Sequence, residues 1–198
     1  MKYYFYDILG YNTSIFLIIN QLAQYNIILI FCKTLAFILE IKLWIMTTIG
    51  LALIVLYNQK ITLHQLRLLV SFYIFTIVFT LAKNIAHYTR PFCEIKGIIT
   101  EYTFTFDCFS SFPSAHAGLA VWIVYNFKVN FYLSIFFVIL TAMSRIILCV
   151  HYPTDTVYGA AMAFVILRIF DKIPNKWLCL LVHIFNKFSK RTIKILDF

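Results

Sequence analysis

Apolar runs alternate with short polar segments along almost the whole chain. A helix needs about 17–25 mainly apolar residues to cross a bilayer. The pattern predicts an all-α membrane bundle with six transmembrane helices, several of them at the short end of that range. The predicted spans cover residues 14–31, 43–57, 68–86, 114–127, 131–148 and 156–170.

The C-terminal segment and the basic residues predict the topology. Residues 177–188 are apolar but are interrupted by His183 and Asn186, which favours a short helix lying on the membrane surface over a seventh span. Six spans place both termini on one side. Cytoplasmic termini put most Lys and Arg side chains inside, in agreement with the positive-inside rule. The loop 87–113 and the turn at His151 then face the other side.

Composition supports a membrane protein. Hydrophobic residues make up 62% of the 198 residues and charged residues only 13%, and the mean hydropathy is +0.85. Soluble domains are nearer half apolar and a quarter charged. The length suits a single integral-membrane domain over residues 1–198. The net charge of +9 does not indicate nucleic-acid binding, because the basic residues are scattered and cluster only near the C-terminus, as in a membrane flank.

The five cysteines show no CxxC spacing, which argues against a zinc or redox motif. Cys32, Cys149 and Cys179 lie in or beside apolar runs and are interpreted as small core residues. Cys93 and Cys108 lie in one loop. They can form a disulfide if that loop faces an oxidising compartment, and the sequence leaves both states open.

The first polar block is KNIAHYTRP, residues 83–91. Lys83 and Arg90 are seven residues apart, which returns nearly to the same helix face after two turns. Two cations at a span end can converge on one anion. Pro91 disfavours helix at Arg90, so the chain is expected to leave the span there. The alternative interpretation is two basic side chains that reach the membrane interface from the span end.

The second block is FPSAHAG, residues 112–118. Ser114 is a candidate helix N-cap. The backbone N–H groups of Ala115 and His116 would then point beyond the helix end, where phosphate binds well. His116 adds a group that titrates near neutral pH. The alternative is an ordinary capped helix with an interfacial histidine.

The third block is SRIILCVHYPTD, residues 144–155. His151 and Asp155 are four apart, so the carboxylate can accept a hydrogen bond from one imidazole nitrogen and leave the other nitrogen's lone pair free for attack. Arg145 precedes His151 by six residues, near the end of the fifth predicted span. The alternative is a polar turn with one ion pair.

Together the blocks read K-x6-RP, PSxH and SR-x5-H-x3-D, and with them the sequence resembles the phosphatidate phosphatase type 2 superfamily. The residues that match are Lys83, Arg90, Pro91, Pro113, Ser114, His116, Ser144, Arg145, His151 and Asp155. Such fixed spacing is far more specific than one short motif. The blocks cover residues 83–155, and the six-span layout extends the resemblance to most of the chain. Ala115 replaces the family's usual Gly, which keeps the N–H donor and affects fine specificity rather than activity.

The resemblance implies phosphoester hydrolysis through a phosphohistidine. His151 would be the nucleophile, Asp155 its orienting partner and His116 the general acid. The implied phosphate-binding residues are Lys83, Arg90, Ser114, Ala115 and Arg145. These cations and donors suit a dianionic substrate, and the sequence offers no Asp/Glu cluster for a catalytic Mg²⁺. We therefore expect metal-independent hydrolysis without a cofactor.

The expected substrate is a lipid phosphate, because the site lies at a membrane surface between helix ends. Candidates from the family are undecaprenyl diphosphate, lipid A phosphate, phosphatidylglycerophosphate and phosphatidate, with a preference for the first two. The expected location is a bacterial inner membrane, with the site facing the periplasm or the cell exterior. A lipid phosphotransferase with the same site and a small non-enzymatic transporter are the alternatives. The sequence leaves the oligomeric state open.

Overall fold

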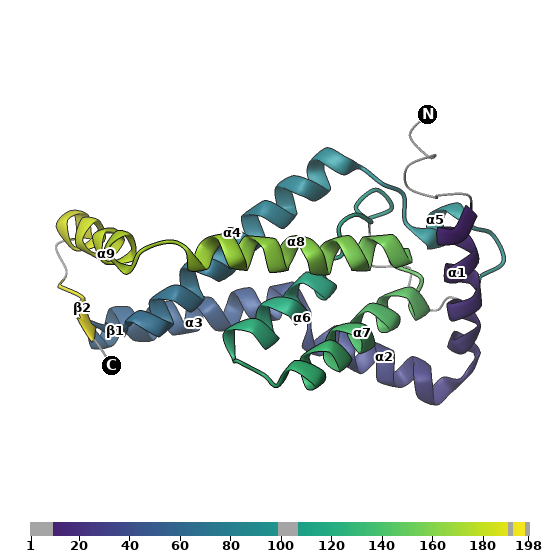
Figure 1. The fold of residues 1–198 in the computed structure, drawn as a ribbon, viewed down its shortest axis with the longest axis horizontal. Helices are drawn as coiled ribbons and strands as arrows, with labels where there is room; N and C mark the ends of the chain where they lie inside the picture. The colour runs from purple at the N-terminus through teal and green to yellow at the C-terminus, as the bar shows by residue number, and fades with distance from the viewer. Residues whose placement is uncertain (1–9, 99–106, 190–191, 197–198) are drawn as a thin grey trace.

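The computed structural model describes residues 10–98, 107–189 and 192–196, which form a mainly helical structure (Figure 1). The all-α fold class is thereby confirmed. The elements, in chain order, are α1 (Tyr11–Asn20), η2 (Gln21–Gln24), α2 (Asn26–Ile38), α3 (Ile41–Asn58), β1 (Lys60–Thr62), α4 (Leu63–Ala86), α5 (Pro91–Glu94), α6 (Ala115–Asn126), α7 (Phe131–Ile147), α8 (Pro153–Asp171), α9 (Asn175–Ser189) and β2 (Lys194–Leu196).

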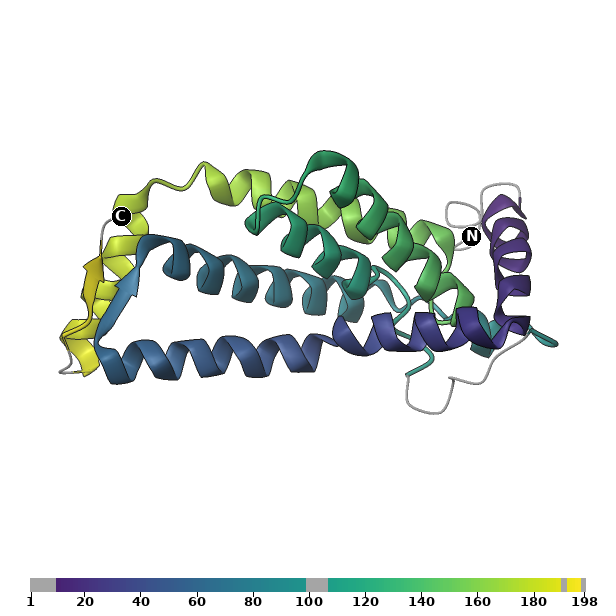
Figure 2. The ribbon, with the colours of Figure 1, turned by 90° about the horizontal axis from the view of Figure 1, so that it is seen from below.

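Helices α2 and α3 follow almost one line along the bundle, interrupted at Leu39 and Glu40 (Figure 2). Among the described residues, two segments are long and apolar enough to cross a membrane: Asn26–Asn58, with 33 residues, and Leu63–Glu94, with 32 residues. Helix α7 is a shorter apolar helix. The remaining predicted spans correspond to α6 and α8, of 12 and 19 residues.

The predicted first span, 14–31, is not one helix. Helix α1 ends at Asn20, and Tyr25 is extended, with φ −91° and ψ 109°, before α2 begins. The physical reason is a buried amide: Asn20 Nδ2 donates to the carbonyl oxygen of Ile147 at 3.3 Å and contacts Cys149 Sγ at 2.9 Å. Hydropathy alone does not reveal this polar anchoring. The predicted second span, 43–57, lies within helix α3.

Helix α1 lies against the start of α8 instead of running the length of the bundle. Asn12 Nδ2 donates to Thr154 Oγ1 at 2.8 Å, and the backbone N–H of Thr154 donates to Asn12 Oδ1 at 3.1 Å. Phe16, fully buried, packs its ring 5.6 Å from that of Tyr152. Strand β2 pairs with β1 at the opposite end (Figure 1). The first and last described helical and strand elements, α1 and β2, therefore lie at opposite ends of the structure. The side of the membrane on which each terminus lies stays a prediction.

Helix α9 crosses the end of the bundle that carries β1 and β2 (Figure 2). Leu178 and Val182 are buried in a cluster with Phe170, whereas Trp177 and Leu181 are exposed. This two-sided character matches the short amphipathic helix expected near the C-terminus. Its placement on a membrane surface stays a prediction.

The core between α4 and α6 is aromatic and sets the position of the α6 helix. Phe72, Phe75 and Phe79 of α4 are almost fully buried beside Trp122 of α6. The Trp122 Nε1–H donates to Ser71 Oγ at 3.1 Å, so the polar N–H of the indole has a hydrogen-bond partner inside the core. This contact holds α6 in a fixed register on α4, and the residues that start α6 belong to the site.

Candidate active site

The predicted site residues gather where α4 and α7 end and α6 and α8 begin. Lys83 lies in the last turn of α4, and Arg145 in the last turn of α7. Ser114 precedes α6, His151 lies in the connection between α7 and α8, and Asp155 lies in the first turn of α8. These residues come from segments far apart in the sequence and meet at one end of the bundle.

Helices α6 and α8 are joined closely at their N-termini. The backbone N–H of Ser114 donates to the Asp155 carbonyl oxygen at 3.0 Å. Ser114 Oγ accepts from the Ala117 N–H at 3.5 Å, so Ser114 is the N-cap that the sequence predicts. A Cβ at Gly159 would lie 3.1 Å from the backbone N of Ser114 and closer still to its carbonyl oxygen. Glycine at this position therefore permits the approach that brings the α6 N-terminus, with Ala115 as its first residue, beside Asp155.

Asp155 is fully buried and binds the segments around it. Its Oδ2 accepts from the Ser111 hydroxyl at 2.6 Å and from the Tyr152 N–H at 2.8 Å. His151 Nδ1 lies 3.6 Å from the same oxygen, too far for the hydrogen bond that the sequence predicts. The prediction of a direct hydrogen bond is therefore wrong for this structure, because the serine hydroxyl and the backbone N–H occupy the carboxylate oxygen. An electrostatic contact between the two side chains remains.

Burial and charge lower the pKa of His151 well below its usual value of 6.5. Burial is the larger cause, since the side chain is almost completely enclosed. The neighbouring charges that add to it belong to Arg90, Lys83, Arg145 and His116. A lowered histidine pKa keeps the imidazole neutral as the pH falls through 6.5. Neutral imidazole is the nucleophilic form, so His151 is suited to attack on an electrophile.

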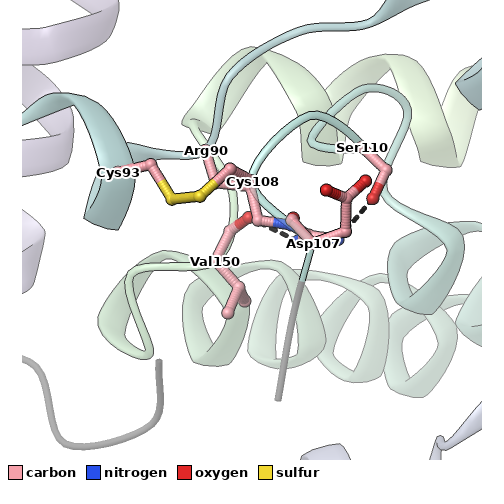
Figure 3. Close-up of a disulfide and its surroundings, with 6 residues drawn as sticks. All are labelled: Arg90, Cys93, Asp107, Cys108, Ser110 and Val150. Atoms are coloured by element: carbon pink, nitrogen blue, oxygen red, sulfur yellow. Dashed lines mark hydrogen bonds between the residues drawn. A yellow bond between two sulfur atoms is a disulfide. The ribbon is translucent and has the colours of Figure 1, made fainter. Parts of the chain in front are cut away.

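Lys83 and Arg90 bind the segment that leads into α6. Lys83 Nζ donates to the Ser110 carbonyl oxygen at 2.7 Å. Arg90 Nε donates to the Asp107 carbonyl oxygen at 2.7 Å and Nη1 to that of Val150 at 2.8 Å (Figure 3). The predicted shared helix face is wrong, because α4 ends at Ala86 and Arg90 is extended. The two cations meet through the 107–111 segment instead.

A disulfide joins Cys93 of α5 to Cys108, directly beside Arg90 (Figure 3). The Cα atoms of the two cysteines are 5.9 Å apart. The backbone N–H of Arg90 also donates to the Cys108 carbonyl oxygen at 2.9 Å. The pairing that the sequence left open is therefore formed, and it ties the 107–111 segment to α5.

Comparison with known proteins identifies the family. A sequence profile of the PAP2 superfamily matches residues 65–179. The chain belongs to the PAP2 superfamily. The matched range contains all three signature blocks, all but the first two residues of α4, and the helices α6, α7 and α8.

A solved structure shares the fold. The crystal structure of LpxE from Aquifex aeolicus superimposes with a TM-score of 0.64 at 19% sequence identity, covering 81% of this chain and 94% of that chain. At this identity the similarity concerns the fold. No curated protein sequence matches the chain significantly.

The PAP2 blocks did not reveal every residue that contacts the site. Ser111 is fully buried and donates to Asp155, but its only sequence signal is its position just before the second block. Glu40 Oε2 lies 3.9 Å from His116 Nε2. The sequence signal for Glu40 is an acidic residue between two apolar stretches, because a charge near a bilayer is costly and marks candidate functional residues.

Removal of the disulfide provides a test of how this loop supports the PAP2 site. The double substitution Cys93→Ser with Cys108→Ser is expected to lower the free energy of unfolding by about 3 kcal/mol, because the unfolded chain regains the freedom of a loop of about 15 residues. The measurement is thermal unfolding in detergent, together with the rate of phosphate release. Cys179→Ser, which removes a free cysteine on α9, is the control. An unchanged Tm for the double variant would contradict this role of the disulfide.

Proposed function

We propose that this protein is a membrane lipid phosphatase that hydrolyses a phosphomonoester or diphosphate through a phosphohistidine on His151. One observation carries the proposal. Within the segment that belongs to the PAP2 superfamily, the signature residues come from separate helices and lie close enough for their charges to act on one another. Such a concentration of cations around two histidines matches the needs of a phosphoryl group in transfer.

In the first step of the proposed mechanism, His151 attacks the phosphorus through Nε2, since its Nδ1 faces Asp155. A P–N bond forms and the bond from phosphorus to the leaving oxygen breaks, while His116 gives a proton to that oxygen. In the second step water attacks the phosphohistidine and its proton passes to His116. The P–N bond breaks, phosphate leaves and both histidines return to their starting states. The Asp155 carboxylate stabilises the positive imidazole during the cycle.

The proposed phosphate cradle combines cations with helix N-terminal donors. The guanidinium groups of Arg90 and Arg145 and the ammonium of Lys83 would neutralise the phosphoryl oxygens. The Ser114 hydroxyl and the Ala115 backbone N–H at the start of α6 would add neutral donors aided by the helix dipole. Positive charge fixed before the reaction lowers the barrier to phosphoryl transfer without reorganisation, so we propose that no metal is required.

The surface supports a membrane location. Ile27, Tyr57 and Ile85, on α2, α3 and α4, are each more than 80% exposed, which suits contact with lipid. Exposed lysines gather instead around the end formed by β1, β2 and α9. They are Lys60, Lys172, Lys176, Lys187 and Lys194. By the positive-inside rule we propose that this end faces the cytoplasm of a bacterial cell.

The site end would then face the periplasm or the cell exterior. The disulfide between Cys93 and Cys108 lies at that end and favours an oxidising compartment. A phosphate presented there on a lipid anchor points to envelope lipids as substrates. Undecaprenyl diphosphate and lipid A phosphate are the preferred candidates over phosphatidylglycerophosphate and phosphatidate.

The test is phosphate release by purified protein in detergent with EDTA present. We expect at least one of the four lipid phosphates to be hydrolysed in EDTA, with a rate that added Mg²⁺ does not raise. The panel is ranked by kcat/KM. Failure with every lipid would overturn the proposal, and activity only with Mg²⁺ would overturn its metal-independent form. Transfer of phosphate to an added lipid alcohol in place of water would identify a phosphotransferase.

A further inference from the structure

Glu40 lies at the interruption between α2 and α3, within reach of His116. Its backbone is extended, with φ −64° and ψ 121°, and its side chain does not cap α3. Glu40 Oε2 lies 3.9 Å from His116 Nε2. The carboxylate is about one-third exposed at 34%, whereas the histidine side chain is only 9% exposed. A carboxylate at this break between apolar helices therefore faces a buried imidazole and not the helix end that it precedes.

His116 Nε2 is buried in a positively charged environment. The pKa of the ring is lowered by burial and by the nearby cations Arg145, Lys83 and Arg90. Among the described residues, Nε2 has no hydrogen-bond partner although it is buried. Buried polar atoms are rarely left unsatisfied, so a partner is expected during function. Nε2 is therefore the nitrogen available to exchange a proton with a substrate, and the Glu40 carboxylate is beside it.

The other charges around His116 are mostly positive. They are Lys83 at the end of α4, Arg90 after it, Arg145 on α7, and His151 in the connection before α8, which itself contacts Asp155. Cations disfavour protonation of an imidazole, and the Asp155 carboxylate is bound by Ser111 and Tyr152. Glu40 is thus the carboxylate that contacts this imidazole among the described residues.

We propose that Glu40 is a positioning residue for His116: its carboxylate lies beside the ring and stabilises the protonated imidazole, whose Nε2 donates to the leaving oxygen. The inference rests on the proposed function. When the P–O bond breaks, the Nε2 proton moves to the leaving oxygen and the imidazole becomes neutral. When water attacks the phosphohistidine, its proton returns to Nε2 and the carboxylate again stabilises the positive ring. The negative charge of Glu40 thereby offsets the effect of the phosphate-binding cations, which disfavour protonation of His116.

The test compares Glu40→Gln with wild type on two substrates. Glutamine keeps the size but removes the charge. For a lipid phosphate that wild type hydrolyses, kcat is expected to fall about 5–10-fold, and the basic limb of the kcat/KM profile to move about 0.5–1 pH unit lower. For p-nitrophenyl phosphate, whose leaving group needs no proton, kcat is expected to change less than about twofold. Glu40→Asp should restore much of the lipid activity.

Asp171→Asn is the matched control, because it removes a carboxylate on α8 at the other end of the bundle. It should leave both rates and the pH profile unchanged. An active wild type with an unaltered Glu40→Gln variant would overturn the role of Glu40 while the proposed function stands. Equal losses on both substrates, without rescue by Glu40→Asp, would show a structural role and overturn the inference as well. An inactive wild type would overturn the proposed function itself.

Discussion

Replacing His151 with alanine is expected to lower lipid phosphate hydrolysis by at least ~10³-fold, because the variant lacks the nitrogen that forms the P–N bond. The residue is suited to this role by its surroundings. It is 2% exposed, and burial with nearby positive charge lowers the pKa of His151 well below 6.5. The neutral imidazole is therefore ready to attack at neutral pH. The remaining cations would still bind phosphate in the variant, so substrate affinity should change much less than kcat.

The measurement is kcat and KM in detergent, with a rapid acid-free quench to trap phosphoprotein on wild type and variant. Only wild type should carry the covalent phosphate. His183→Ala is the matched control, since His183 is exposed on α9 at the other end of the bundle. Thermal unfolding of both variants separates a loss of chemistry from a loss of fold. A folded His151→Ala protein with wild-type kcat would show that the nucleophile lies elsewhere.

The second large effect is expected from Gly159→Ala. The added Cβ would lie against the Ser114 carbonyl oxygen and 3.1 Å from the Ser114 N, and backbone atoms cannot move aside as a flexible side chain can. Helix α8 would have to withdraw from the start of α6, which separates Asp155 and His151 from the proposed phosphate cradle. Overpacking of this kind costs about 1–3 kcal/mol of stability. Misplacement of the site by about 1 Å should lower kcat/KM by roughly 10²-fold.

Gly50→Ala is the control for Gly159→Ala. Gly50 lies inside α3, and a Cβ added there has no neighbouring atom within 4 Å. Alanine is favoured over glycine in a helix by up to about 1 kcal/mol, so this variant should be as stable as wild type or slightly more stable, with unchanged kcat/KM. Thermal unfolding and kinetics of the two variants provide the comparison. If Gly159→Ala and Gly50→Ala had the same Tm and the same kcat/KM, the contact between α6 and α8 would not be what holds the site together.

Helices α4, α6, α7 and α8 lie close to the ranges predicted from hydropathy. Each is a local apolar run bounded by a local signal, such as the Ser114 cap or Pro153 in the first turn of α8. The first predicted span fails because Asn20 is anchored by atoms more than 100 residues away. Local periodicity contains no information about such a partner. The same limit explains why residues 83–90 were expected to form one helical face although α4 ends at Ala86.

By itself, the sequence determined the helical class, the superfamily and the residues of the proposed chemistry, because these depend on local composition and on spacing within short blocks. The tertiary structure alone decided which groups those residues contact. In the folded structure Cys93 and Cys108 form a disulfide, the Ser111 hydroxyl donates to the Asp155 carboxylate, and Glu40 lies beside His116. Each of these contacts joins separate segments of the chain, and their distances are set by how the helices pack.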